Sequence, residues 1–261
     1  MNNAAIGIFD SGFGGLTVAR AIHRRMPNES ILYFGDSARC PYGPRDQEEV
    51  RGFVREICSK FIEQDVKLIV IACNTATAAG LSMAQKEFDV PIVGVVEPGA
   101  RAAVRTTRKR KIGVLATKGT VDSNAYVKAL QRYDAGVLVT QQAASRFVEL
   151  AEAKFSGKLD DVVLQNALKE YCQPLIDAHV DTVVLGCTHF PLLQDEIQAA
   201  FGKCVSLISS ATETARDVDH ILQYRNHLCS PDINAKCAFN TSGKDKKKFQ
   251  RICRHILGNC S

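Results

Sequence analysis

Two short stretches, residues 68–75 (LIVIACNT) and residues 182–189 (TVVLGCTH), decide the fold. Each begins with a run of branched apolar residues, which is the pattern of a strand buried on both faces of a parallel sheet. Each then changes to a small residue, a cysteine and two polar residues. In an open α/β sheet, ligands bind outside the carboxyl ends of the strands. The sequence therefore predicts that Cys73 and Cys187 lie at strand ends where chemistry can take place.

Strand and helix patterns alternate on either side of these stretches. The apolar runs predict strands at residues 6–9, 31–34, 68–71, 92–96, 111–116, 136–140, 182–186 and 205–208. Helical spacing predicts helices at about residues 16–26, 46–64, 74–86, 120–132 and 211–227, two more between 145 and 178, and a basic amphipathic helix at 244–257. Such alternation predicts an α/β fold with parallel sheets and right-handed crossovers.

The pattern also repeats along the chain. Gly113 stands 106 residues after Gly7 in a similar strand and loop, and Cys187 stands 114 residues after Cys73. A period of this length indicates two similar lobes and not a solenoid of short repeats. We therefore predict a pseudo-duplicated α/β protein of two lobes, each a mostly parallel sheet flanked by helices, with the active site in the cleft between them. The first lobe would comprise residues 1–96 and 210–261, and the second residues 97–209.

Composition excludes several classes of protein. Of the 261 residues, 46% are hydrophobic and 23% are charged, as in ordinary soluble globular proteins. No apolar run reaches the length of a membrane span or of a secretory signal, and the ten cysteines form no C-x-x-C pair. We therefore expect a cytoplasmic protein with reduced thiols. The net charge of +5 is mild, and we interpret the basic runs at 105–111 and 244–254 as solvated helix ends, which gives no reason to expect a nucleic-acid partner.

The two strand-end cysteines differ from the others in their surroundings. Cys58, Cys172 and Cys204 fall on apolar helix faces or strand edges, where cysteine behaves as a small hydrophobe. Cys73 and Cys187 each precede a predicted helix, whose N-terminus lowers the pKa of a thiol and favours the thiolate. Two thiols facing each other across a cleft suit removal of a proton from one face of a carbon and delivery of a proton to the other. Hydrolysis suits them less well, because it needs one nucleophile and one base.

Metal and dinucleotide sites are weaker interpretations of the same motifs. A zinc site at Cys187 and His189 lacks a second close pair of ligands, so no metal is expected. Gly12 and Gly14 match half of a dinucleotide fingerprint, with Asp36 in the place of a ribose-binding acid, but Thr17 occupies the third glycine position. Backbone N–H groups at the start of the following helix would instead bind a carboxylate.

Three polar residues stand close to the two thiols in this scheme. Asp10 ends the first predicted strand, where it could act as a general base or as a partner of Cys73, or could simply cap the next helix. Thr117 takes the corresponding place in the second lobe. His189 follows Cys187 by two residues and could orient or protonate groups near that thiol.

Taken together, these motifs resemble the glutamate racemase family within the cofactor-independent aspartate/glutamate racemase superfamily. The matching segments are residues 8–17 (IFDSGFGGLT), 41–43 (PYG), 72–76 (ACNTA), 97–100 (EPGA), 185–193 (LGCTHFPLL) and 241–243 (TSG), with Phe249. They run along nearly the whole chain, and the second cysteine motif is the most specific of them.

The resemblance implies a reaction and a set of roles. Glutamate would be interconverted between its L and D forms without a cofactor, supplying D-glutamate for bacterial peptidoglycan, by an enzyme that forms homodimers. Cys73 and Cys187 match the acid/base pair of the family, and Asp10 and His189 match the residues that assist them. The substrate-binding pairs would be Asp10-Ser11, Tyr42-Gly43, Asn74-Thr75 and Thr188-His189, with Thr117 in addition.

One segment departs from the family pattern. Residues 143–152 (AASRFVELAE) lack the prolines that the family often has before an acidic residue. The resemblance assigns an assisting role to Glu152 at the end of this segment, and Glu149 is its competitor.

Two rival functions remain open at this point. A racemase of the same superfamily that acts on aspartate would share most of these motifs. A two-lobed binding protein without catalysis would bind an amino acid and leave its stereochemistry unchanged, but binding alone needs no thiol on each face of the ligand.

Overall fold

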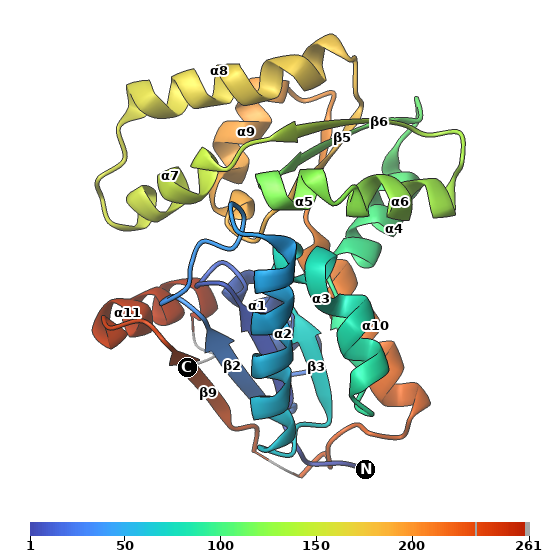
Figure 1. Cartoon of the computed structure of the whole chain (residues 1–261), viewed down its shortest axis with the longest axis vertical. Coiled ribbons are helices and arrows are strands. Elements are labelled where there is room, and N and C mark those ends of the chain that lie inside the picture. The colour runs from blue at the N-terminus through green and yellow to red at the C-terminus, as the bar shows by residue number, and fades with distance from the viewer. Residues whose placement is uncertain (233, 259–261) are drawn as a thin grey trace. The chain divides into compact units, whose positions relative to one another are not determined.

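The computed structural model describes residues 1–232 and 234–258. The chain forms two compact units, one from Met1–Val95 with Ala211–Ser261 and the other from Val96–Ser210. Each unit is built on one parallel sheet with helices packed against it (Figure 1). The predicted α/β class with two parallel sheets is confirmed.

The first unit contains a five-stranded sheet in the order β4-β3-β1-β2-β9. Its strands are β1 (Ile6–Asp10), β2 (Ile31–Gly35), β3 (Leu68–Ile71), β4 (Ile92–Gly94) and β9 (Cys237–Thr241). Its helices are α1 (Leu16–Arg25), α2 (Gln47–Ile62), α3 (Asn74–Glu87), α10 (Ser210–Tyr224) and α11 (Lys246–Leu257). The last strand comes from the end of the chain and pairs in parallel with β2 (Figure 1).

The second unit contains a four-stranded sheet in the order β6-β5-β7-β8. Its strands are β5 (Lys111–Ala116), β6 (Leu138–Ala143), β7 (Thr182–Gly186) and β8 (Ser206–Ile208). Its helices are α4 (Val96–Thr106), α5 (Lys118–Asp122), α6 (Ala125–Tyr133), α7 (Arg146–Phe155), α8 (Asp161–Asp177) and α9 (Gln194–Phe201), with a short 3-10 helix at Phe190–Leu193.

The two sheets share one topology. When the strands are numbered by their order within each unit, both sheets run 4-3-1-2, and the first unit adds β9 beyond β2. The strand that precedes Cys73 and the strand that precedes Cys187 are therefore both third in their unit, and each pairs with the first strand. This equivalence extends the repeat seen in the sequence to the strand order.

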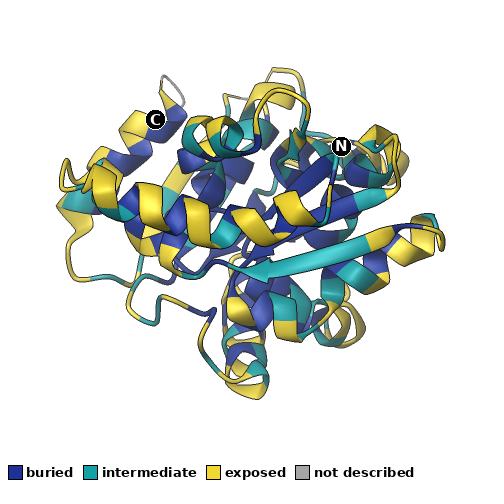
Figure 2. Cartoon of the chain, turned by 90° about the horizontal axis from the view of Figure 1, so that it is seen from above, coloured by how far each residue is buried: buried dark blue, intermediate teal, exposed yellow. Residues whose placement is uncertain are grey.

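Burial follows from this arrangement. All residues of β1, β3 and β7 are buried, because helices cover both faces of the central strands. Exposed residues gather on the outer faces of the helices, and the edge strand β6 is only partly buried (Figure 2). The central strands can therefore present polar groups only at their ends.

Several predicted elements differ in the structure. The single helix expected at 120–132 is divided into α5 and α6 by Asn124, whose φ of 52° is left-handed, a conformation that asparagine adopts more readily than most residues. The strand expected at 136–140 lies at Leu138–Ala143. The prediction that Cys204 lies on an apolar helix face or strand edge as a small hydrophobe is wrong, because this residue lies in an exposed turn after α9. The structure adds α4 and β9, and β9 alternates between exposed and partly buried residues as an edge strand does.

The buried thiols make the stability of the fold dependent on pH. Burial raises the pKa of Cys172 to about 12, whereas an unfolded cysteine has a pKa of about 8.5. Between these values the unfolded chain loses a proton that the folded chain keeps, so the free energy of unfolding falls as pH rises, by up to about 1.4 kcal/mol per pH unit for each such thiol.

We expect Cys172→Ala to lower the free energy of unfolding at pH 7 by about 1 kcal/mol, because it removes buried apolar contact. At pH 10 the variant should equal or exceed the wild type in stability, because it lacks the titrating thiol. Urea denaturation at both pH values measures this, with Cys204→Ala at the exposed position as the control. A cost of Cys172→Ala that is the same at both pH values would contradict the explanation.

Candidate active site

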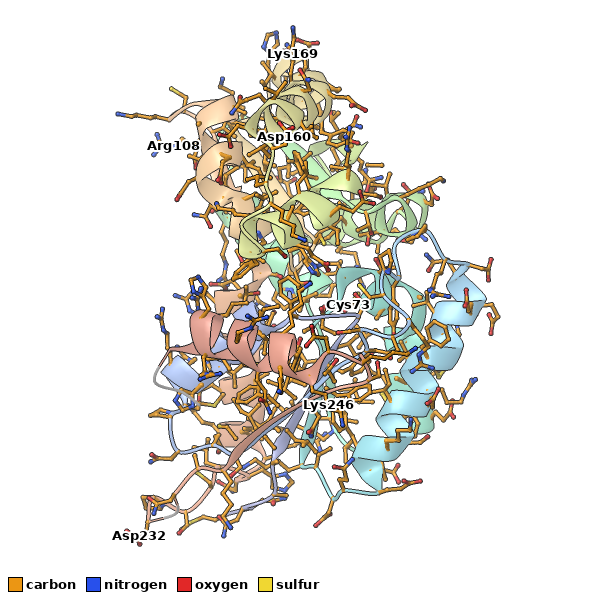
Figure 3. The ribbon with its side chains drawn as sticks, turned by 90° about the vertical axis from the view of Figure 1, so that its left-hand side faces the viewer. Cys73, Arg108, Asp160, Lys169, Asp232 and Lys246 are labelled. Carbon is orange, nitrogen blue, oxygen red and sulfur yellow. The ribbon has the colours of Figure 1, made fainter. Side chains whose placement is uncertain are left out.

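Cys73 lies at the carboxyl end of β3 (Figure 3). It is the N-cap residue of α3, and its Sγ accepts a hydrogen bond from the backbone N–H of Ala76 at 3.5 Å. The same Sγ lies 3.8 Å from the hydroxyl oxygen of Ser11, which follows β1. The side chain is only 5% exposed. The thiol is thus held at a strand end with little exposure to solvent.

Asp10 stands at the matching end of the neighbouring strand β1. Because Phe9 pairs with Ile71 across the two strands, Asp10 and Cys73 share one edge of the sheet. The Asp10 side chain is fully buried, and its Oδ2 accepts a hydrogen bond from the N–H of Gly12 at 3.0 Å. A Cβ at Gly15 would lie 2.5 Å from the Cβ of Asp10, so the loop after β1 can close over this carboxylate only with glycine there.

These surroundings set the protonation of Cys73. Burial and, to a smaller extent, the nearby Asp10 carboxylate raise the pKa of this thiol, the hydrogen bonds from Ala76 and Ser11 lower it, and the net effect is a pKa of about 12. The prediction that the N-terminus of the helix favours the thiolate is therefore wrong for Cys73, because loss of solvent and a negative neighbour outweigh the helix dipole. The thiol is protonated near neutral pH and becomes a strong base once it has been deprotonated.

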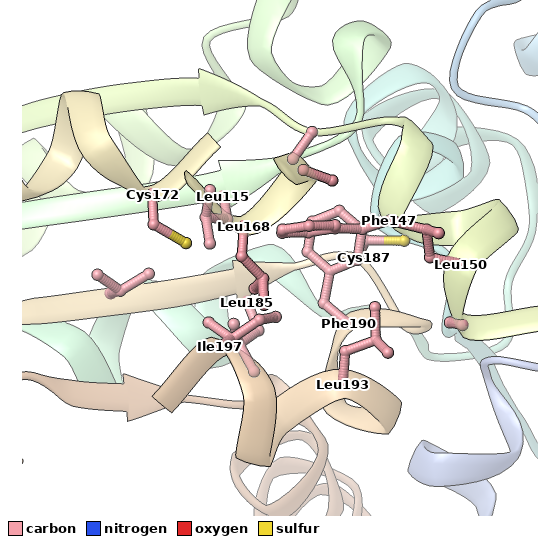
Figure 4. Close-up of a cluster of buried hydrophobic side chains, with 14 of the residues drawn as sticks. Leu115, Phe147, Leu150, Leu168, Cys172, Leu185, Cys187, Phe190, Leu193 and Ile197 are labelled. Carbon is pink, nitrogen blue, oxygen red and sulfur yellow. The ribbon is translucent and has the colours of Figure 1, made fainter. Parts of the chain in front are cut away.

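Cys187 follows β7 in the second unit. It is 7% exposed and lies beside the rings of Phe147 and Phe190 in the apolar core (Figure 4). A Cβ on Gly186 would lie 3.0 Å from Ala116, from the carbonyl oxygen of Leu115 and from Tyr126, so a larger residue there would require these neighbours to shift. The helix expected directly after Cys187 is instead a turn followed by the 3-10 helix Phe190–Leu193, and α9 starts later.

His189 is buried within that turn. Its Nε2 lies 3.6 Å from Oε1 of Glu152 on α7, which is too long for a hydrogen bond and close enough for an ion pair when the imidazole is protonated. Glu149 is exposed to solvent one turn earlier on the same helix. The structure therefore brings Glu152, and not Glu149, close to His189.

The other residues singled out in the sequence also gather at the carboxyl ends of the strands of their own units. In the first unit, Asn74 and Thr75 form the first turn of α3, and Tyr42 is buried on the loop after β2. In the second unit, Thr117 follows β5 with its Oγ1 3.2 Å from that of Thr120, and Thr188 is buried directly after Cys187. The catalytic and binding roles assigned to these residues remain predictions.

Asp36 is a buried residue whose hydrogen-bond network was not predicted from the sequence. It follows β2, and its carboxylate accepts hydrogen bonds from the protein's own Tyr42, Arg39 and Ser242. These donors occupy both carboxylate oxygens, so Asp36 does not offer the ribose contact of a dinucleotide site. The signal available in the sequence was its position directly after a predicted strand, which is also where Asp10 stands relative to the first strand.

Among residues 1–232 and 234–258, no group of three or more His, Cys, Asp or Glu side chains is placed to hold a metal ion. Within the same residues, none of the helices has the length and apolar character needed to cross a membrane.

Known proteins resemble this chain in both sequence and structure. A family model described as Asp/Glu/hydantoin racemase matches residues 15–218. The glutamate racemase of Exiguobacterium sibiricum is 46% identical over 256 residues, which are 98% of this chain and 93% of that protein. The crystal structure of glutamate racemase isoform RacE1 from Bacillus anthracis matches with a TM-score of 0.93 at 42% identity, covering 99% of this chain and 95% of the other.

A second solved structure, that of the glutamate racemase from Francisella tularensis in complex with D-glutamate, matches with a TM-score of 0.88 at 29% identity, covering 98% of this chain and 94% of that one. The matches in sequence and in structure extend over both units. The chain therefore belongs to the Asp/Glu/hydantoin racemase family of enzymes.

Proposed function

We propose that the protein is a glutamate racemase that interconverts L-glutamate and D-glutamate by proton transfer at Cα, with Cys73 and Cys187 as the two bases. The observation that carries the proposal is the equivalence of the two cysteines. Each follows the third strand of a sheet with the same strand order, beside the end of the first strand. The high identity to curated glutamate racemases over nearly the whole chain supports glutamate as the substrate.

The chemistry of the reaction explains why two thiols are needed. In a two-base inversion at Cα, one group removes the proton from one face and another group delivers a proton to the opposite face. The thiolate on one side takes the Cα proton, the thiol on the other side gives up its own proton, and the roles exchange for the reverse reaction. Each step conserves protons, and no electron transfer is involved.

The neighbours of each thiol suit this task. Asp10 shares a sheet edge with Cys73, and its carboxylate is the group that we propose accepts the Cys73 proton to form the thiolate. His189, two residues after Cys187 and 3.6 Å from Glu152, is proposed to serve the second thiol. A thiolate with a raised pKa is a stronger base, which favours removal of a weakly acidic Cα proton.

Donors at the same strand ends are proposed to stabilise the charge that develops on the substrate. Ser11, Asn74 and Thr75 stand at the carboxyl end of the first sheet, and Thr117 and Thr188 at that of the second. Hydrogen-bond donors fixed in advance in a site with little water stabilise such charge more than water does.

The proposal extends to the role of the enzyme in the cell. D-glutamate would be supplied for peptidoglycan by a cytoplasmic homodimer. The nine cysteines within the described residues are free thiols, which agrees with a reducing compartment. The rival substrate, aspartate, is less well supported because the curated relatives with the higher identities are named glutamate racemases.

The thiols provide the first test of the mechanism. We expect Cys73→Ala and Cys187→Ala each to lower kcat for racemisation by at least about a thousandfold, as loss of a general acid or base does. Circular dichroism of solutions of each glutamate enantiomer, with no added cofactor, measures the rate. Cys58→Ala is the matched control, because Cys58 is also buried and should affect stability alone. Unchanged circular dichroism with the wild type would favour a binding protein.

Isotope exchange tests the use of two bases. With L-glutamate in heavy water, the D-glutamate formed early should carry deuterium at Cα, because the thiol that delivers the proton has exchanged with solvent beforehand. The remaining L-glutamate should carry little deuterium while the first thiol is shielded from solvent. Mass spectrometry of the separated enantiomers measures both. Early D-glutamate that retains protium would point to a single base.

The pKa of Cys73 tests its link to Asp10. Removing the negative charge with Asp10→Asn removes one cause of the raised pKa, so the thiolate fraction at pH 9 should rise and alkylation of Cys73 by iodoacetamide should accelerate. Racemisation should nevertheless slow, because Asn cannot accept the proton. Peptide mass spectrometry follows alkylation, with buried Cys58 as the internal control. If Asp10→Asn left the alkylation rate of Cys73 unchanged, the carboxylate would not be acting on this thiol.

A further inference from the structure

Asp36 is a buried carboxylate with three side-chain donors. Its side chain is 1% exposed. The hydroxyl of Tyr42 and Nε of Arg39 each donate to its Oδ2 at 2.5 Å, and the hydroxyl of Ser242 donates to its Oδ1 at 2.8 Å. The charge of Arg39 and these hydrogen bonds compensate for the loss of water around the carboxylate.

The third donor comes from the end of the chain. Ser242 follows β9, which pairs with β2, and its backbone N–H donates to the carbonyl of Gly35 at 3.1 Å. Thr241 donates from its hydroxyl to the same carbonyl at 2.9 Å. The hydroxyl oxygen of Ser242 also accepts the N–H of Ala38 at 2.9 Å. The turn after β9 (residues 241–243), called the C-terminal turn below, therefore holds the first residues of the loop that carries Tyr42.

Tyr42 is fixed on its other side by packing. Its ring lies 5.3 Å from the ring of Phe53 on α2, and it belongs to the buried cluster that contains Phe9 and Cys73. Its hydroxyl has Asp36 as its partner, and the backbone N–H of Asp36 donates to the carbonyl of Asp10 at 2.9 Å. Asp36 thus connects the Tyr42 loop both to the strand end that holds Asp10 and to the C-terminal turn.

Stability alone does not account for a carboxylate in this place. A buried ionised group stabilises a fold no better than a well-packed apolar group, because the loss of its hydration offsets the attraction to its partners. What the carboxylate adds is a single geometry, since Arg39 and Tyr42 from its own loop and Ser242 from the turn after β9 must converge on it. That geometry determines where Tyr42 and Gly43 lie.

We propose that Asp36 is a positioning residue for the substrate-binding pair Tyr42-Gly43, and that Ser242 of the C-terminal turn acts through Asp36. The inference rests on the proposed function, because the resemblance to the glutamate racemases is what assigns this pair to the substrate. The inference also gives a role to the Thr241-Ser242-Gly243 motif at the carboxyl end of β9. Loss of Asp36 weakens binding of glutamate by loosening the loop and leaves the two thiols in place.

Asparagine cannot replace Asp36 in this network. Its amide has one accepting oxygen and one donating NH2 group, whereas all three partners donate hydrogen bonds to the carboxylate. At least one partner must therefore turn away. We expect Asp36→Asn to raise the KM for glutamate by about tenfold, the effect of losing one hydrogen bond to a charged group, and to change kcat by less than about threefold.

Ser242→Ala should raise KM by about threefold, since it removes one neutral hydroxyl. The double variant should be no worse than Asp36→Asn, because Ser242 acts through Asp36. The matched control is Asp219→Asn. Asp219 is also a buried carboxylate and accepts hydrogen bonds from Arg25 and Gln223, but it has no partner among the proposed site residues. Its replacement should lower Tm and leave KM unchanged.

A second measurement does not depend on activity. Hydrogen exchange of the peptide covering residues 37–46 reports on two hydrogen bonds of the loop. The N–H of Ala38 donates to the hydroxyl oxygen of Ser242, and the N–H of Arg45 donates to the carbonyl of Tyr42. Asp36→Asn should speed this exchange by about tenfold, and Asp219→Asn should leave it unchanged.

The outcomes separate the two proposals. Faster exchange with an unchanged KM, or additive effects of Asp36→Asn and Ser242→Ala on KM, would overturn the positioning role and leave the proposed function intact. A wild type that never racemises glutamate would refute the proposed function. In that event unchanged exchange in Asp36→Asn would overturn the role of Asp36 as well, and faster exchange would retain it as the residue that holds the loop.

Discussion

The pairing of the first strand with the third in each sheet is the contact on which the rest of the structure depends. β1 pairs with β3, and β5 pairs with β7. Every residue of these four strands is buried except Lys111, the first residue of β5. A strand buried on both faces cannot carry polar side chains along its length without cost. The polar residues therefore collect at the carboxyl ends, where Asp10 and Cys73 meet in one unit and Thr117 and Cys187 in the other.

Enclosure at these ends has electrostatic consequences. The N–H groups at the start of α3 favour a thiolate at Cys73, but burial and the Asp10 carboxylate act in the opposite direction and prevail. The site thus keeps the thiol protonated in the absence of substrate and places a carboxylate nearby. A thiol of this kind is unreactive at rest and strongly basic once ionised, which suits a proton transfer more than attack by a nucleophile.

The return of the chain to the first sheet after the second unit has a similar effect on the loop after β2. β9 extends the sheet beyond β2, and the turn that follows places Ser242 against Asp36. A loop of about ten residues that is rich in Pro and Gly would otherwise have few contacts to hold it. The C-terminal segment thereby reaches a loop that precedes it by about two hundred residues.

The sequence by itself determined the α/β class, the repeat and the two cysteine motifs, because apolar runs and their spacing are local signals that survive without coordinates. Glycines beside Asp10 and Cys187 were visible too, although the close contacts that require them were not. Only the tertiary structure decided the raised pKa of Cys73, the proximity of Glu152 to His189, and the network around Asp36. Each of these depends on burial or on partners from distant segments, and desolvation and long-range contacts have no signature in the local pattern of residues.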